Sequence, residues 1–410
     1  MALKYQTTTL ANGLTVSAEI NPNAHSFAAG FFVKTGSCDE TPAINGVSHF
    51  LEHMMFKGSD KYGWEDVNRI FDEIGARYNA FTSQETTAYY ANVIPEFTER
   101  AIEHLSHLLR PAIRQADFDT EKNVITEEIA MYLDDPGHVV YEKLMELHFG
   151  NHPLGMSILG PADTIRALKR EQMVQYFQDR YGPGNTILAC TGSMDFDRIV
   201  KLAEKYCGAW EPKSAERKIV QPTLTSSRHD LTDAKLNRHY TMTLMPGPSA
   251  QDDRRFAARV LADVLGDSEG SRLYWALVDP AIAEEADFGF YPHDGCGSFY
   301  LSLVTDPDKS QKALDIALAE LKRARNDLNE AEVERARNKI ASSLVLGGES
   351  PLGRMRAIGN QWVYTGTYRS LDEDMATLLA VTPQSLKQLL DEYPFEPMTV
   401  VTLGPGEKSA

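Results

Sequence analysis

The stretch His49-Phe50-Leu51-Glu52-His53 is the most informative part of this 410-residue chain. Residues four apart on an α-helix point to the same side, because one turn takes 3.6 residues. His49 and His53 would therefore present two imidazoles together, and neutral imidazole is a good ligand for zinc. Glu52 borders the same face, where a carboxylate could accept a proton from a water beside the metal.

The order His-x-x-Glu-His inverts the commoner His-Glu-x-x-His of metalloprotease helices and is itself a zinc-peptidase signature. The same five residues could also be an ordinary pair of surface or core histidines on an amphipathic helix. A structural zinc site is closed by four protein ligands, whereas a catalytic site uses three and leaves one position for water. The choice depends on whether the chain supplies a third ligand.

The segment Glu121–Leu133 is predicted to form a helix, because its apolar residues follow a helical period. Asp117, Asp119 and Thr120 precede it and offer capping oxygens. Glu121 and Glu128 share one apolar stripe, whereas Glu127 points about 100° away from Glu128. Two carboxylates on an apolar stripe are unfavourable unless something compensates their charge. A nearby metal would do so, and a solvated acidic helix face is the alternative.

On these residues the chain resembles the inverzincin peptidases typified by pitrilysin, insulin-degrading enzyme and the mitochondrial processing peptidase. The resemblance is closest to the short-chain, processing-peptidase-like branch and covers essentially the whole chain. It rests on Leu10–Val16, Gly46–Gly58, Gly75–Thr82, Glu121–Ile129, Ser271–Tyr274 and Glu349–Met355.

The resemblance implies that Glu128 completes a zinc site with His49 and His53, with one zinc per chain. Glu121 would orient a ligating ring or adjust the charge at the metal. The alternative for Glu121 is a plain helix-start acid favoured by the helix dipole. Glu52 would be the general base that activates water for attack on a peptide carbonyl and then passes the proton to the leaving nitrogen.

Residues 79–89 contain threonines and aromatic residues typical of a strand near the zinc helix. An exposed edge there could bind an extended peptide through main-chain pairing. The candidate substrate-binding residues are Asn79, Ala80, Phe81 and Thr82. An internal strand would explain the same pattern.

The second half departs from the pattern of active family members. The resemblance would place an arginine and a tyrosine, seven residues apart, after Ser271–Leu277, where they reach the substrate and the developing oxyanion. Residues 278–290 hold neither at its expected place. Loss of such donors typically lowers a rate by about 10²–10³-fold. Either a second chain supplies the missing groups, or this chain binds zinc and cleaves poorly.

The sequence thus predicts a zinc-dependent metalloendopeptidase acting on peptides or unfolded segments, as a homodimer or as a heterodimer with a related subunit. The alternative is a zinc-binding partner subunit of a peptidase-like dimer, with weak or no activity. An intact Glu52 favours the first prediction, and the altered segment 278–290 favours the second. A metal-binding protein of unrelated activity is a third class.

The length, charge and cysteine content of the chain limit the number of domains, the classes of partner and the cellular location that we expect. A chain of 410 residues exceeds one ordinary core and predicts two domains. Its formal net charge of −17 disfavours nucleic acids and anionic membranes as partners. There is no run of 18 apolar residues and no signal or transit segment in residues 1–20. The four cysteines form no Cys-x-x-Cys pair, and together these features predict a cytoplasmic protein.

The two halves look like diverged copies of one unit. A predicted strand at 87–94 is followed by a proline and an amphipathic helix, and the same order recurs from 298–304 onward. Each half ends with another strand-like run, at 185–191 and at 398–403. The polar stretch 211–228 has the composition of an exposed linker.

The predicted domains are therefore 1–215, which holds the zinc motif, and 225–410, a homologous copy without it. Strands at hairpin spacing mixed with long helices predict an α+β fold. The resemblance implies two α/β sandwich domains, each a mainly antiparallel sheet with helices packed on it, that face each other as a clamshell.

Two further histidine pairs, His104 with His107 and His148 with His152, could in principle bind a metal. No third acidic or cysteine ligand is evident beside either pair. Both pairs are therefore predicted to be structural or surface residues.

Overall fold

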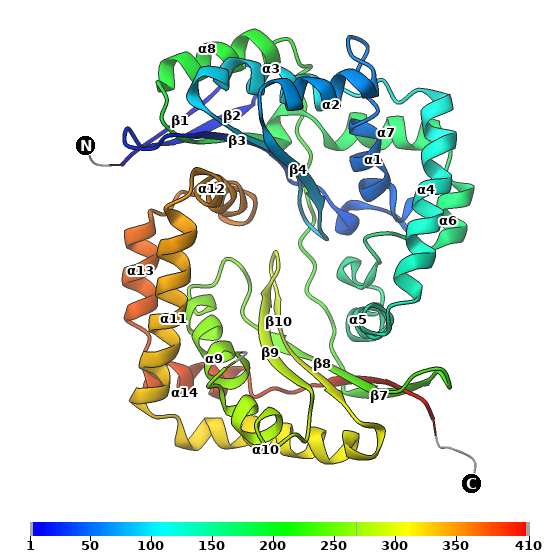
Figure 1. Ribbon diagram of the computed structural model, residues 1–410, viewed down its shortest axis with the longest axis vertical. Coiled ribbons are helices and arrows are strands. Elements are labelled where there is room, and N and C mark those ends of the chain that lie inside the picture. The colour runs from blue at the N-terminus through cyan, green and yellow to red at the C-terminus, as the bar shows by residue number, and fades with distance from the viewer. Residues whose placement is uncertain (1–2, 268, 407–410) are drawn as a thin grey trace. The chain divides into compact units, whose positions relative to one another are not determined.

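The structure is a computed structural model that describes residues 3–267 and 269–406. These residues form two compact units, each with one mixed β-sheet and helices packed on it (Figure 1). The predicted α+β class is confirmed. The first unit contains the segments up to 130, 156–218 and 346–369, and the second contains 131–155, 219–345 and the segment from 370 onward.

The sheet of the first unit has the strand order β1-β2-β6-β3-β5-β4. Strands β2 and β6 run parallel, and the other neighbouring pairs are antiparallel. The strands are β1 (Lys4–Thr9), β2 (Thr15–Ile20), β3 (Phe27–Val33), β4 (Arg77–Thr82), β5 (Thr87–Val93) and β6 (Thr186–Gly192).

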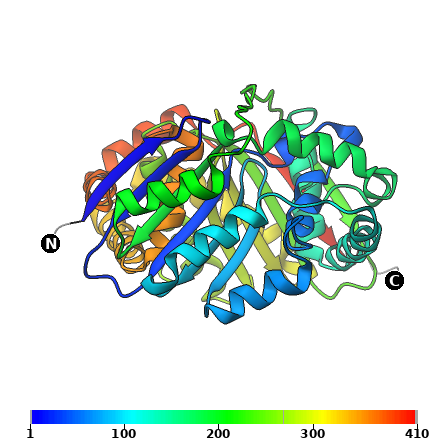
Figure 2. The same ribbon diagram turned by 90° about the horizontal axis from the view of Figure 1, so that it is seen from above.

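Strand β3 lies inside this sheet and is buried on both faces. Because side chains alternate along a strand, Phe31 points to one side and Phe32 to the other. Helices α3 (Thr98–Leu108) and α8 (Phe196–Cys207) cover the Phe31 side and are seen from above in Figure 2. Helix α12 (Pro351–Thr365) covers the Phe32 side (Figure 1). Both faces of the first sheet are therefore occupied.

A buried ion pair fixes α12 to this sheet. The Arg354 guanidinium donates to both carboxylate oxygens of Glu19 on β2, over 2.9 Å from Nε and 2.5 Å from Nη2. The Tyr368 hydroxyl donates to the same carboxylate over 2.6 Å. The side chains of Arg354 and Glu19 are 7% and 4% exposed. Each charge therefore depends on the other for compensation.

Replacing Arg354 by methionine should lower the free energy of unfolding by about 3–5 kcal/mol, because Glu19 would stay buried without its counter-charge. Urea unfolding followed by circular dichroism measures the change. Adding Glu19→Gln should recover part of the loss, since no uncompensated charge then remains. A loss below about 1 kcal/mol, as for exposed pairs, would contradict a role for this pair in holding α12.

The sheet of the second unit has the order β7-β11-β8-β10-β9. Strands β7 and β11 run parallel, and the other neighbouring pairs are antiparallel. The strands are β7 (Ser227–Thr232), β8 (His239–Gly247), β9 (Glu285–Pro292), β10 (Gly297–Thr305) and β11 (Thr399–Gly404).

Helices cover both faces of the second sheet as well. Helices α9 (Arg255–Gly266), α10 (Ser310–Asp327) and α14 (Pro383–Glu392) share one apolar core with it. Helix α5 (Pro136–Phe149) lies on the other face (Figure 1), where His148 Nδ1 and Thr399 Oγ1 are 3.0 Å apart. Five further helices are α2 (Trp64–Glu73), α6 (Ala162–Ala167), α7 (Arg170–Arg180), α11 (Glu330–Gly348) and α13 (Leu371–Leu379).

The two sheets repeat one topology. The order β2-β6-β3-β5-β4 in the first corresponds to β7-β11-β8-β10-β9 in the second, with the parallel pair in the same place. The predicted strands at 87–94 and 298–304 are β5 and β10, and each is followed by a proline and a helix. The runs at 185–191 and 398–403 are β6 and β11. The duplication seen in the sequence is thus also present in the topology.

The compact units are not consecutive halves of the chain. Residues 131–155, which carry α5, belong to the second unit, and residues 346–369, which carry α12, belong to the first. The predicted boundaries 1–215 and 225–410 therefore separate the two sequence repeats, whereas each compact unit also includes one segment from the other repeat. The stretch predicted as a linker is irregular up to residue 226, and its last two residues begin β7. Among the described residues, no helix has the length and apolar character needed to cross a membrane.

Candidate metal centre

Helix α1 (Val47–Met55) carries the five-residue motif, so the helix predicted there is confirmed. Phe50 and Leu51 are fully buried and face the core of the first unit. His49 and His53 lie on a partly buried side of the helix, with side chains 12% and 28% exposed and ring centroids 4.8 Å apart. The apolar side of α1 therefore determines where both imidazoles point.

A carboxylate from the preceding loop holds the start of α1. Gly46 has a φ of +95°, and a Cβ there would lie 2.4 Å from the carbonyl oxygen of Leu159, so this position requires glycine. Glu40 accepts hydrogen bonds from the amides of Gly46 and Ser48, both over 2.7 Å. Amides in the first turn of a helix have no partner within the helix. Glu40 therefore caps the helix that carries the motif.

Helix α4 (Gln115–Leu133) brings the distal carboxylates to the site. It begins earlier than the predicted Glu121, so residues 117–120 lie inside the helix and the predicted caps are wrong. The physical reason is Phe118, which is 1% exposed and stacks on Phe50 of α1 with ring centroids 4.8 Å apart. Burying this ring extends the helix by a turn and a half and packs it against α1.

His49, His53 and Glu128 converge on one point. One ligand atom of each lies within 4.8 Å of the others. Glu128 is 3.9 Å from His49 Nε2 and 3.6 Å from His53 Nε2, too far for hydrogen bonds. In a tetrahedral zinc shell with bonds of about 2.0–2.1 Å, ligand atoms lie about 3.4 Å apart. The donor set and its spacing therefore fit a zinc ion.

Glu121 lies behind His53. His53 Nδ1 donates to Glu121 over 2.9 Å, which leaves the Nε2 lone pair on the side of Glu128. Lys57 Nζ lies 2.5 Å from the other oxygen of Glu121. Burial raises the pKa of Glu121, but the bonds from His53 and Lys57 outweigh burial and hold the pKa below its ordinary value. An ionised carboxylate in this position fixes the ring tautomer of His53.

The two histidines differ in their electrostatic environment. Burial, and then the neighbouring His53, lowers the pKa of His49 to about 4, so this ring is neutral at pH 7. Burial also lowers the pKa of His53, but the bond to Glu121 and the charge of Glu128 raise it above its ordinary value. The neighbouring carboxylates therefore outweigh burial at His53, whereas burial dominates at His49.

Glu52 projects from α1 toward the end of strand β4. The Thr82 hydroxyl donates to Glu52 Oε2 over 2.5 Å. Burial raises the pKa of Glu52, opposed by this bond and by the charge of His53. A carboxylate with a raised pKa is a better proton acceptor than an exposed one, which is what a general base requires.

The predicted strand at 79–89 is in fact a hairpin. Residues 83–86 form the turn between β4 and β5, and β4 is the last strand of its sheet. Asn79, Ala80, Phe81 and Thr82 all belong to this edge strand, so the interpretation as an internal strand is wrong for them. The Ala80 amide donates to the Asn79 side chain over 2.9 Å.

The segment 278–290, where the resemblance would place an arginine and a tyrosine, begins at the end of a π-helical turn (Tyr274–Val278) and continues into β9. The nearby Arg272 is 8% exposed and pairs with Glu332 over 2.8 Å and with Asp327 over 2.5 Å. Arg272 is therefore engaged in its own unit and does not stand in for the missing arginine.

The other histidine pairs have structural partners. His104 Nε2 bonds to the carbonyl of Val67 over 2.9 Å, and His152 Nε2 to the carbonyl of Val220 over 2.8 Å. Within residues 3–267 and 269–406, His49, His53 and Glu128 are the one group of three that could hold a metal.

Several contacts of the site were not anticipated from the sequence. Lys57 follows His53 by four residues, so helical spacing could have placed it beside the same carboxylate. The bond from Thr82 to Glu52 and the cap by Glu40 could not be predicted from residue spacing. Thr82 and Glu40 lie outside helix α1, so no helical period relates them to the residues that they contact.

The comparisons with known proteins identify the family of the chain. Residues 15–162 match the insulinase family (peptidase family M16), and residues 167–340 match the peptidase M16 inactive domain. An uncharacterized zinc protease of Streptomyces coelicolor is 31% identical over 408 residues, which cover 97% of this chain and 89% of the relative. A solved protease structure from Helicobacter pylori has a TM-score of 0.90 at 19% identity, covering 98% of this chain and 100% of that chain.

The similarity extends to an assembled complex. A chain in the structure of complex III2 from Candida albicans has a TM-score of 0.86 at 19% identity, covering 98% of this chain and 96% of that chain. The present chain belongs to the M16 peptidase family. The predicted resemblance is confirmed, and relatives at this level of identity are named zinc proteases.

Proposed function

We propose that this chain is a zinc-dependent metalloendopeptidase that cleaves peptides or unfolded segments. The observation that carries the proposal is the convergence of His49, His53 and Glu128 on one point, with Glu52 on the adjoining turn. One zinc ion per chain would be held by these three residues, which leaves a position for water as catalytic sites do.

A zinc ion held by these residues would act as a Lewis acid, lowering the pKa of a bound water towards neutrality and polarising a peptide carbonyl. The Glu52 carboxylate accepts the proton of the attacking water and then donates it to the leaving nitrogen. The Thr82 hydroxyl holds one oxygen of Glu52, so the other oxygen is free to face the water. Proton transfer by a positioned carboxylate is thus the principal task of the protein itself.

Glu121 and Lys57 act on His53 and not on the substrate. The bond from His53 Nδ1 to Glu121 orients the ring and keeps Nε2 unprotonated for the metal. Lys57 compensates the charge of Glu121, which is 4% exposed. Of the two explanations for Glu121, these contacts support a role in orienting a ligand.

The edge strand β4 is proposed to bind the substrate by main-chain pairing. It ends at Thr82, which contacts Glu52, so a peptide added to this edge would run past the catalytic carboxylate. Asn79, Ala80 and Phe81 would then lie along the peptide.

Replacing Ala80 by proline should raise the KM for peptides about tenfold or more, because a main-chain donor of the edge is lost and its strand geometry is disturbed. Zinc content should not change. Steady-state kinetics and metal analysis measure the two effects. The matched control is Ala80→Gly, which changes the same side chain but keeps the main-chain amide that proline removes. An unchanged KM in Ala80→Pro would exclude pairing at this edge.

The segment 278–290 favours a second candidate, a weakly active or non-catalytic subunit of a peptidase-like dimer. It lacks the arginine and tyrosine of active relatives, and a similar fold occurs in a chain of the Candida albicans complex III2 structure. A related subunit, or a second copy of this chain, would then complete the site. None of the four cysteines, all within the described residues, forms a disulfide, which is consistent with a reducing compartment, and we propose the cytoplasm.

The test is cleavage of a mixed peptide pool by the purified chain, with and without a chelator. We expect cleavage that stops on chelation and returns when zinc is added. One bound zinc per chain without cleavage would favour the partner-subunit function. Absence of zinc binding would contradict both.

A further inference from the structure

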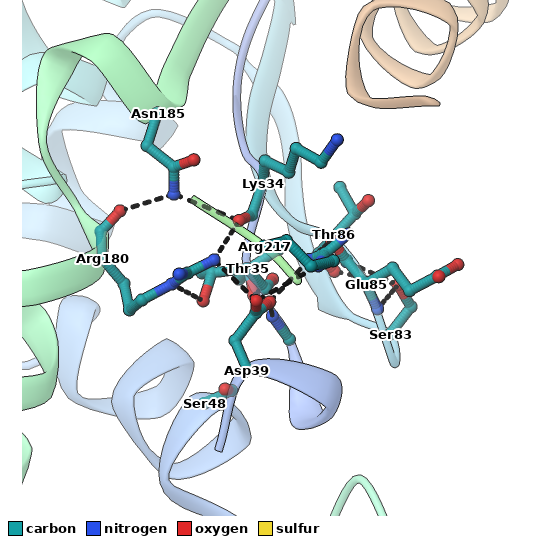
Figure 3. A network of polar contacts seen from close by, with 12 residues as sticks. Lys34, Thr35, Asp39, Ser48, Ser83, Glu85, Thr86, Arg180, Asn185 and Arg217 are labelled. Carbon is teal, nitrogen blue, oxygen red and sulfur yellow. Dashed lines mark hydrogen bonds and ion pairs between the residues drawn. The ribbon is translucent and has the colours of Figure 1, made fainter. Parts of the chain in front are cut away.

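A buried network of charges lies in the first unit, apart from the metal ligands. Its centre is Asp39, at the end of a 3₁₀ turn (Ser37–Asp39) between β3 and α1, with a side chain 3% exposed. Arg180 of α7 donates to it over 2.7 Å, and Arg217 donates over 3.1 Å from Nε and 2.5 Å from Nη2. Figure 3 shows the two guanidiniums reaching Asp39 from separate segments.

The positive charges of Arg180 and Arg217 are balanced only when Glu85 is counted together with Asp39. Two arginines with side chains 11% and 7% exposed face the single carboxylate of Asp39. Burial lowers the pKa of Arg217, but the bond to Asp39, its charge and then the charge of Glu85 hold the pKa above its ordinary value. Glu85 is itself 3% exposed. Asp39 and Glu85 together therefore compensate Arg180 and Arg217.

Arg217 also donates a hydrogen bond to the main chain of the β4–β5 turn. The Nη2 atom that bonds Asp39 also donates to the carbonyl of Glu85 over 2.7 Å. The Cys38 amide donates to the carbonyl of Gln84 over 2.8 Å. A Cβ on Gly36 would lie 2.2 Å from the Ser83 carbonyl oxygen, so the 3₁₀ turn and the hairpin turn are in direct contact. The hairpin is thus held to the segment that precedes α1.

The segment that contains Asp39 and Glu40 contacts two elements of the proposed catalytic site, the β4–β5 hairpin and helix α1. Asp39 binds Arg217 and through it the hairpin turn, while the next residue, Glu40, caps α1. The hairpin carries Thr82, and α1 carries Glu52, the residue to which Thr82 donates. The distance between these two side chains is therefore set by a segment to which both elements are fixed.

We propose that Arg217 is a positioning residue for the catalytic base. By joining Asp39 to the Glu85 carbonyl, it holds the β4–β5 turn so that the Thr82 hydroxyl stays on Glu52. Arg217 lies in the irregular segment 211–226, remote in sequence from both residues, and acts through its bonds to Asp39 and to the carbonyl of Glu85. We call the attachment of the β4–β5 turn to Asp39 through Arg217 the hairpin lock. The effect of Arg217 on catalysis rests on the proposed function, but the hairpin lock itself does not.

The lock is tested by hydrogen exchange, which needs no peptidase activity. In Arg217→Ala, the amides of residues 83–87 should exchange about 10- to 100-fold faster, the factor expected for loss of one hydrogen bond to a charged group. Arg217→Lys should be intermediate, since an ammonium keeps the charge but cannot span Asp39 and the carbonyl as a fork. The control is Arg166→Ala, whose side chain is 60% exposed and pairs with Asp163.

The consequence for catalysis is tested by coupling to Thr82. Arg217→Ala should lower kcat about tenfold with zinc content unchanged, and should have no further effect in a Thr82→Val background. A purely structural role would instead give effects that add. Valine has nearly the same shape as threonine and carries a methyl group in place of the hydroxyl, so Thr82→Val removes the hydrogen bond to Glu52.

The outcomes separate the two proposals. Faster exchange at 83–87 in both Arg217 variants supports the lock even if the wild-type chain cleaves nothing, which would count against the proposed function alone. Unchanged exchange overturns the lock. Faster exchange with additive kinetic effects overturns the link to Glu52. If Arg217→Ala does not fold, the Arg217→Lys variant carries the same comparisons.

Discussion

Replacing Glu52 by glutamine should lower the rate of peptide cleavage by about 10²–10⁴-fold, the usual contribution of a positioned general base. Glutamine has the same shape and can still accept the bond from Thr82, but it cannot take a proton from water. Glu52 does not belong to the three converging ligands, so zinc binding should persist. Single-turnover cleavage of a fluorescent peptide and metal analysis of the same sample measure both quantities.

The matched control is Glu127→Gln, which changes an exposed carboxylate in the same unit and should leave the rate unchanged. Cleavage by Glu52→Gln at the wild-type rate would assign proton transfer to another group. If the wild-type chain binds zinc and shows no cleavage for the variant to reduce, a second subunit is needed to complete the site.

Replacing Glu128 by glutamine should weaken zinc binding by more than about 100-fold, the upper range for loss of a residue that only supports a ligand. The change removes the single negative charge from a set that otherwise consists of two imidazoles. Neutral carbonyl oxygen is also a poorer zinc ligand than carboxylate. Competition with a chromophoric chelator gives the affinity without any activity measurement.

Glu127→Gln again serves as the control, because it lies one residue earlier on α4 but is exposed. Wild-type affinity in Glu128→Gln would mean that another group supplies the third ligand. Glu121, which already bonds His53 and Lys57, would then be the first residue to test.

Local patterns in the sequence were enough for the repeating parts of the fold. Strand, proline and amphipathic helix recur with a shift of about 210 residues, and these elements are β5 and α3 in one copy and β10 and α10 in the other. The spacing of His49 and His53 gave the helix and the shared face, because helical geometry alone determines both. The distal carboxylates were found because seven residues make almost two turns.

Contacts between distant segments were not predictable in this way. The early start of α4 depends on Phe118 stacking on Phe50, and the sequence does not reveal that these two rings meet. The hairpin turn at 83–86 contains Ser, Gln, Glu and Thr, without the glycine that marks a tight turn. The partners of Asp39 lie about 140 and 180 residues away, so no local spacing could have connected them.

The placement of α12 bears on the order in which the protein can fold during synthesis. The strands of the first sheet are complete once residue 192 has been made, yet one face of that sheet is covered by residues 351–365. Until those residues leave the ribosome, Phe32, Tyr90 and their neighbours on that face have no cover from the helix that finally buries them. A nascent chain of this length would expose an apolar surface for about 10–35 s at ordinary elongation rates of about 5–20 residues per second. The strands of the first unit are thus synthesised early, but the helix that completes its core is synthesised late. Chaperones could bind the exposed face of the sheet during this interval.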